Sequence, residues 1–145
     1  MPNRPLTEFL SDQRVLAAPP DQSVLDAVRQ MAERNVGAIL VLSDGALKGV
    51  FTERDLLRRV VAAGKDPAAT QLAAVMTTEV VSIAATHRGY EAFQLMHDSG
   101  VRHVVVTGLP GAIGYGVVSI RDFAPGDLAR FEKELAFEEH VWEVV

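Results

Sequence analysis

Cysteine is absent from this chain of 145 residues. Without a thiol, the protein has no disulfide bond, no thiolate zinc site, no cysteine nucleophile and no thiol redox switch. Long apolar runs are also absent, because the longest, around Ile39 to Leu42, falls far short of the roughly 20 residues that cross a bilayer. The first residues lack the apolar core of a secretory signal. We therefore expect a cytoplasmic protein that does not span a membrane.

Positive charge is scarce relative to negative charge. The chain has 14 basic and 19 acidic residues, which gives a formal net charge of -5. Such a molecule repels a phosphate backbone unless its basic residues are gathered locally, so we expect no nucleic-acid partner. The hydrophobic content of 48% excludes a disordered or fibrous chain. It favours one ordinary globular domain, or two very small ones that share a core.

Catalytic and metal-binding motifs are also missing. The sequence contains no Gly-x-Ser-x-Gly, no Walker-type loop and no Gly-x-Gly-x-x-Gly, and we expect no enzyme activity. The histidines show no close metal-ligand pairing, so we expect no metal site; they are His87, His97, His103 and His140. His103 lies in an apolar strand and has two interpretations. It is either an ordinary strand residue with one ring nitrogen in a hydrogen bond, or a residue that contacts the phosphate and the base of a bound ligand.

An internal repeat organises the sequence. The matches at a separation of 65 are Ala27 with Ala92, Met31 with Met96, Val36 with Val101 and Val41 with Val106. The matches at a separation of 67 are Gly49 with Gly116, Val50 with Val117, Arg54 with Arg121 and Asp55 with Asp122. The two extra residues fall in a turn, where insertions are tolerated. We therefore predict a first repeat over 1–70, a second over 71–125 and a C-terminal helix over 126–145.

Each repeat has the pattern strand, helix, strand, strand, helix. In the first repeat, the strands are predicted at 15–18, 37–42 and 47–51. The first helix is predicted at 24–31, with Asp21 or Ser23 as its N-cap. The second helix is predicted at 56–61, and its apolar stripe consists of Leu56, Leu57, Val60 and Val61. In the second repeat, the strands are predicted at 80–83, 101–106 and 115–118, and the helices at 90–97 and from Ser119. Asp44-Gly45 marks a hairpin turn, and Pro125 should end the last helix after about one turn.

A doubled motif lies where a strand runs into a helix, over 49–55 and again over 116–122. In each copy a hydroxyl residue precedes an aspartate by three positions, as Thr52 does Asp55 and Ser119 does Asp122. This spacing is first of all a helix-capping arrangement. The same geometry also suits a ligand, because free N–H groups at a helix start can hold a phosphate and the carboxylate can accept ribose hydroxyls.

The segments 36–41, 49–57, 75–77, 100–106 and 116–122 resemble CBS (cystathionine β-synthase type) domains, and the resemblance covers roughly residues 6 to 125. It implies an α/β (α+β) fold of two β-α-β-β-α repeats, paired about a pseudo-twofold axis with two clefts. In similar proteins those clefts take AMP, ATP, NAD or S-adenosylmethionine. Departures in the second copy, at Gly89, Pro110 and Pro125, leave open whether one cleft or both are occupied.

The resemblance also implies roles for individual residues. The ribose would be held by Asp55 and Asp122, and phosphate or ribose would meet Thr52 and Ser119. The phosphate partners would be Arg54, Arg121 and Arg102. The adenine would lie near Ala18, Gly37, Ala38 and Ile39, or near Ile83, Val101, Arg102 and His103.

A helix beyond the repeats, over 127–142, carries an apolar stripe of Leu128, Phe131, Leu135 and Trp142. This stripe docks either on its own domain or on a second subunit, and the resemblance to dimeric disks favours a homodimer. We expect a non-catalytic regulatory module that requires no cofactor, binds an adenosyl ligand and signals to an unidentified regulated protein. The alternative is a ligand-free scaffold that acts through the C-terminal helix.

Overall fold

Two compact units make up the computed structural model, which describes residues 3–10, 13 and 15–144 and the side chains as far as residue 139. The first-repeat unit is Arg14–Val80, and the second-repeat unit joins Met1–Gln13 to Val81–Val145. Each unit has a three-stranded sheet and its own hydrophobic core. Within the described residues, no helix is long and apolar enough to cross a membrane.

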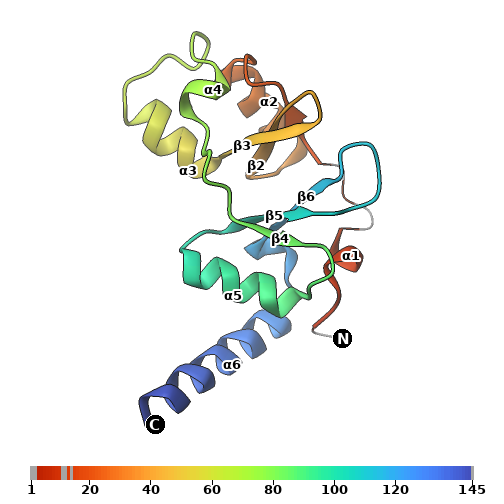
Figure 1. Cartoon of the computed structure of the whole chain (residues 1–145). Helices are drawn as coiled ribbons and strands as arrows, with labels where there is room; N and C mark the ends of the chain where they lie inside the picture. Colours follow the sequence, from red (N-terminus) through yellow and green to blue (C-terminus); the bar gives the residue numbers. More distant parts are fainter. Residues whose placement is uncertain (1–2, 11–12, 14, 145) are drawn as a thin grey trace. The chain divides into compact units, whose positions relative to one another are not determined.

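The first-repeat unit has the predicted order strand, helix, strand, strand, helix, and then a short helix, α4 (Leu72–Val75), that the sequence did not predict (Figure 1). The other elements are β1 (Ala17–Ala18), α2 (Val24–Arg34), β2 (Ala38–Ser43), β3 (Ala46–Thr52), α3 (Glu53–Asp55) and η1 (Leu56–Val61). The sheet order is β1-β2-β3, with β1 parallel to β2 and β2 antiparallel to β3. A parallel pair needs a crossover, which α2 provides.

Local turn chemistry sets the ends of these elements as predicted. Ser23 is the N-cap of α2, since its Oγ accepts a hydrogen bond from the Asp26 N–H at 3.2 Å. The turn between β2 and β3 has positive φ at both Asp44 (52°) and Gly45 (77°). This is the backbone of a two-residue hairpin that matches the twist of the strands. The predicted buried hairpin is therefore confirmed.

The apolar stripe predicted for the last helix of the first repeat is half wrong. Val60 is fully buried and Leu56 packs against the core, but Leu57 and Val61 are 62% and 61% exposed. They lie on η1, a π-helical segment in which the N–H of Ala62 bonds to the carbonyl of Leu57 at 2.9 Å. The core therefore covers only one side of the predicted stripe.

The second-repeat unit repeats the order strand, helix, strand, strand, helix, with α1 (Leu6–Phe9) added before it and α6 (Pro125–Val144) after it. Its other elements are β4 (Ser82–Ala84), α5 (Gly89–Ser99), β5 (His103–Thr107), β6 (Tyr115–Ser119) and η2 (Ile120–Asp122), with sheet order β4-β5-β6. As predicted, the helix after β6 is a single turn: η2 ends at Asp122, and Phe123 is extended. Pro125 then begins α6, a position where its missing N–H costs nothing.

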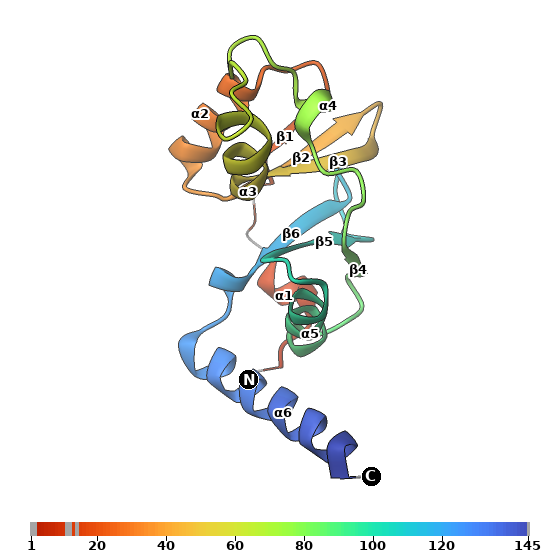
Figure 2. The same cartoon turned by 90° about the vertical axis from the view of Figure 1, so that its left-hand side faces the viewer.

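An N-terminal segment that the sequence did not predict completes this unit. The Leu6 N–H bonds to the His87 carbonyl at 3.0 Å, and the Gly89 N–H bonds to the Arg4 carbonyl at 2.9 Å. Figure 2 shows α1 close to α5 as a result. A Cβ on Gly89 would lie 2.9 Å from the ring of Phe9, so the glycine at the start of α5 allows this close packing. The segment around α4 pairs with the start of α2 in the same way, through Ser23 and Gln71.

The first half of α6 docks on its own domain. For this half, the first of the two predicted interpretations, docking on the same chain and not on a second subunit, is therefore correct. Phe131 is 1% exposed, and its ring centroid lies 5.6 Å from those of both Phe93 and Phe123. Leu135 is also buried, and Leu128 packs against the same cluster. Farther along α6, Phe137 is 69% exposed. The side chain of Trp142 lies outside the described residues.

Candidate functional site

The same strand-to-helix turn is built in both units. In the first, Thr52 caps α3: its Oγ1 accepts from the Asp55 N–H at 3.3 Å, and the Asp55 carboxylate accepts from the Thr52 N–H at 3.0 Å. In the second, the Ser119 Oγ accepts from the Arg121 N–H at 3.0 Å, and Asp122 accepts from the Ser119 N–H at 2.7 Å. The capping interpretation is therefore correct in both repeats, whatever else these residues do.

Strand pairing brings part of the predicted site together. Ala38 is the register partner of Thr52, and the Glu53 N–H bonds to the Gly37 carbonyl at 3.0 Å. In the second unit His103 is the partner of Ser119, and the Ile120 N–H bonds to the Arg102 carbonyl at 3.0 Å. Thus the start of β2 or β5 lies directly beside the start of the following helix.

Other predicted adenine contacts lie elsewhere. Ala18 pairs with Val41, and Ile83 pairs with Val106. Each partner is three residues beyond the strand start, or about 10 Å along the strand. Ile39 is fully buried in the core, so its side chain does not face a ligand at the helix start. Val101 is half-buried against the second core.

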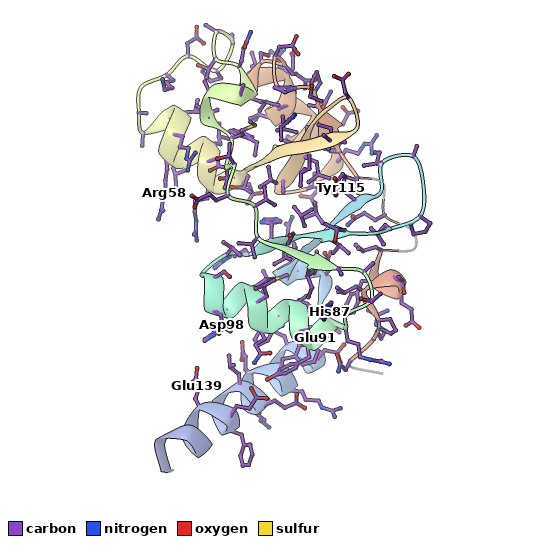
Figure 3. The ribbon with its side chains drawn as sticks, in the orientation of Figure 1. Arg58, His87, Glu91, Asp98, Tyr115 and Glu139 are labelled. Carbon is purple, nitrogen blue, oxygen red and sulfur yellow. The ribbon has the colours of Figure 1, made fainter. Side chains whose placement is uncertain are left out.

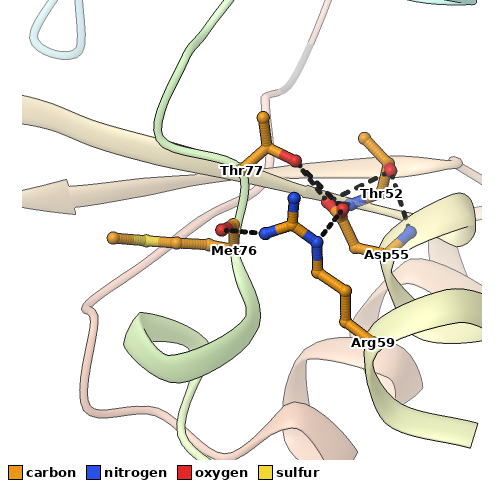
Figure 4. A network of polar contacts seen from close by, with 5 residues as sticks. All are labelled: Thr52, Asp55, Arg59, Met76 and Thr77. Atoms are coloured by element: carbon orange, nitrogen blue, oxygen red, sulfur yellow. Dashed lines mark hydrogen bonds and ion pairs between the residues drawn. The ribbon is translucent and has the colours of Figure 1, made fainter. Parts of the chain in front are cut away.

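The Asp55 carboxylate lies in a closed polar network, shown in Figure 4. Only 6% of the residue is exposed. The Thr77 hydroxyl donates to it, 2.9 Å from Oδ1 and 3.1 Å from Oδ2. Arg59 lies 3.6 Å from Oδ1 through Nε and donates through Nη1 to the Met76 carbonyl at 2.9 Å. The network joins the helix start to the segment that leads out of the first repeat.

This outgoing segment runs along β3. Val50 and Thr77 exchange two backbone hydrogen bonds, of 3.0 Å and 2.8 Å. Gly49 permits the approach, because a Cβ there would lie 2.7 Å from the Thr77 carbonyl oxygen and 2.9 Å from the Met76 sulfur. Sequence reasoning noted Val75-Met76-Thr77 as part of a motif but assigned Thr77 and Arg59 no role. The repeated glycine before the motif was the signal that another backbone passes close by.

Asp122 has different surroundings. It is exposed, and its one hydrogen bond among the described contacts is the one from the Ser119 N–H. A side chain replaces the outgoing segment here: Gln13 donates through Nε2 to the Val117 carbonyl at 2.6 Å and accepts from the Val117 N–H at 2.9 Å. The carboxylate of the second repeat is therefore accessible to a ligand, whereas that of the first is not.

Two of the predicted arginines stand in the helical turns themselves, Arg54 in α3 and Arg121 in η2, and Arg102 directly precedes β5. The predicted phosphate partners Arg54, Arg102 and Arg121 are all exposed. A guanidinium can engage two phosphate oxygens at once, so an exposed arginine beside an open carboxylate suits a nucleotide, which carries both phosphate and ribose.

The histidines form no comparable cluster. Figure 3 shows His87 beside Glu91 at the start of α5, where their hydrogen bond lowers the pKa of the Glu91 carboxyl. His103 is half-buried on β5, and His140 lies outside the described side chains. In the described part of the chain, no group of three or more His, Cys, Asp or Glu residues could hold a metal ion.

Comparison with known proteins gives a consistent family. The CBS domain model matches residues 7–62 and 72–124. The mitochondrial CBS domain-containing protein CBSX3 of Arabidopsis thaliana is 36% identical to this chain over 120 residues. The match covers 79% of this chain and 57% of the plant protein, so the chain spans little more than half the length of that relative. The crystal structure of the CBS domain protein NE2398 has 32% identity and a TM-score of 0.73, covering 88% of this chain and 96% of that one. The structure of the CBS domain protein PAE2072 of Pyrobaculum aerophilum complexed with AMP has 24% identity and a TM-score of 0.72. The match covers 90% of this chain and 98% of that one.

Proposed function

This chain belongs to the CBS-domain family, with two copies in tandem, and we propose that it binds an adenosine-containing ligand and signals its presence to a protein partner. CBS domains are generally regulatory modules, and the chain would act in the cytoplasm as a sensor without catalysis or a required cofactor. The observation that carries the proposal is the exposed Asp122 carboxylate beside Ser119 at a helix start. A carboxylate accepts the two hydroxyls of a ribose through its two oxygens.

The test is a melting series with AMP, ATP, NAD and S-adenosylmethionine. AMP comes first, because it is the ligand in the PAE2072 structure of the same fold. A ligand at 100 times its Kd should add about 2.7 kcal/mol to the free energy of unfolding, which is several degrees in Tm. Guanosine monophosphate is the matched control, since it offers the same ribose phosphate with another base. The proposal fails if none of the four raises Tm at millimolar concentration.

Self-association is part of the proposal. The exposed pair Leu57 and Val61 lies on one helix, four residues apart, and two such apolar side chains together are unusual on a surface that faces only water. We expect a dimer by light scattering at micromolar concentration and a monomer for Leu57→Lys. Ile113→Lys, which changes another exposed apolar residue (39% exposed), should leave the dimer intact. A monomer mass for the unmodified chain would contradict the homodimer.

A second candidate is the ligand-free scaffold that acts through its C-terminal helix. Its support is Phe137, which is 69% exposed on α6 beyond the part that docks on the domain. A scaffold should melt at the same temperature with and without every nucleotide, and should lose its bound partner when Phe137 is changed to Ser. The sensor should instead keep the ligand response in that variant.

A further inference from the structure

The acceptor positions of Asp55 are already occupied within the protein. Oδ2 accepts from the Thr52 N–H, the Thr52 hydroxyl and the Thr77 hydroxyl, at 3.0, 3.2 and 3.1 Å. Oδ1 accepts from the same Thr77 hydroxyl at 2.9 Å and faces Arg59 at 3.6 Å. A ribose diol needs two free acceptor positions on such a carboxylate. To bind there, it would first have to displace Thr77 from a residue that is only 6% exposed.

Neither Thr77 nor Arg59, the two residues that close this network from outside the turn, recurs in the second repeat. Arg59 corresponds to Gly126 at the repeat separation of 67, so the guanidinium is missing. Val117, the counterpart of Val50, bonds to the side chain of Gln13 rather than to a threonine, and no hydroxyl donates to Asp122 among the described contacts. The exposure of Asp122 agrees with the loss of both groups.

We propose that the two aspartates of the doubled motif have divided roles. Asp55 is a positioning residue that fastens the outgoing segment at Met76 and Thr77 to the first-repeat unit. Asp122 is the ribose-binding residue, and the chain takes one adenosine ligand, in its second repeat. The ligand half of this inference rests on the proposed function, whereas the role of Asp55 does not.

Matched asparagine variants of the full chain separate the two roles. In either orientation the amide nitrogen of Asp55→Asn faces a group that can only donate, the Thr52 N–H or the Arg59 guanidinium, so Tm should fall by about 5 °C or more. Asp122→Asn can still accept from the Ser119 N–H through its amide oxygen, so its Tm should stay within about 2 °C. By titration calorimetry with AMP, the unmodified chain and folded Asp55→Asn should each bind one AMP per chain, with Kd values within threefold. Asp122→Asn should bind AMP at least tenfold more weakly.

A pair of threonine variants tests the fastening without any ligand. Thr77→Val keeps the shape of the side chain and removes the hydroxyl that donates to Asp55, so Tm should fall by several degrees. Thr78→Val makes the same change at the neighbouring exposed position and should leave Tm unchanged.

The outcomes distinguish failure of the inference from failure of the proposed function. Two AMP molecules per chain, or loss of AMP binding in folded Asp55→Asn, would overturn the divided roles while supporting adenosine sensing. No binding of AMP, ATP, NAD or S-adenosylmethionine by the unmodified chain would overturn the proposed function and the ligand half together. The role of Asp55 is then decided by melting alone: equal losses in Asp55→Asn and Asp122→Asn, or in Thr77→Val and Thr78→Val, would refute it.

Discussion

Phe131→Ala is expected to lower the free energy of unfolding by about 3–5 kcal/mol, the usual cost of truncating a fully buried phenylalanine. Phe131 is 1% exposed and lies among three aromatic rings, with centroid distances of 5.3 Å to Tyr90 and 5.6 Å to Phe93 and Phe123. Removing its ring leaves a cavity between α6 and the second core. Urea denaturation followed by circular dichroism measures the loss.

Phe137→Ala is the control on the same helix. Phe137 is 69% exposed, so its truncation should change the free energy of unfolding by less than about 0.5 kcal/mol. Similar small effects for both variants would show that α6 is not anchored on its own domain through Phe131. In that case the helix would be available as a docking element, and the scaffold alternative would gain support.

Gly49→Ala is expected to cost about 2–3 kcal/mol, near the upper end for overpacking a tight site. Its Cβ would lie 2.7 Å from the carbonyl oxygen of Thr77, an atom that is held by the backbone pairing of Thr77 with Val50. The backbone cannot withdraw without breaking that pairing, and with it the contact from Thr77 to Asp55.

Gly116→Ala is the matched change at the same position of the second repeat. There the Cβ would meet Leu109 Cδ1 at 2.7 Å and Leu10 Cδ1 at 3.0 Å, which are the ends of flexible side chains. These side chains can rotate away, so the expected cost is below about 1 kcal/mol. Urea denaturation of the two variants side by side gives the comparison, and a larger loss for Gly116→Ala would contradict the account of the outgoing segment.

The family, the fold and most elements could be predicted because adjacent residues encode them. The Asp44-Gly45 turn, the Ser23 cap and the doubled Thr-to-Asp and Ser-to-Asp spacing each act over a few residues, and each occurs where the sequence placed it. The break before Pro125 was also predictable, because a proline cannot continue the preceding turn. These local signals agree with one another, which is why the two repeats were clear.

What could not be predicted depends on contacts between distant segments. Thr77 meets Asp55 from 22 positions away, and the segment around Leu6 pairs with residues near His87. The doubled motif therefore looks equivalent in sequence, although Asp55 is buried and Asp122 is exposed. The exposure of Leu57 and Val61 was missed for another reason: an apolar pattern at helical spacing does not show which of its side chains the core will cover.

The most direct measurement for the central claim is the identity of the small molecule that accompanies the freshly purified protein. After denaturation and removal of the chain, mass spectrometry should find an adenosine-containing compound in the released material. The same compound, added back to ligand-free protein, should bind to the unmodified chain and at least tenfold more weakly to Asp122→Asn. Release of no such compound, together with no binding of AMP, ATP, NAD or S-adenosylmethionine on addition, would contradict the account.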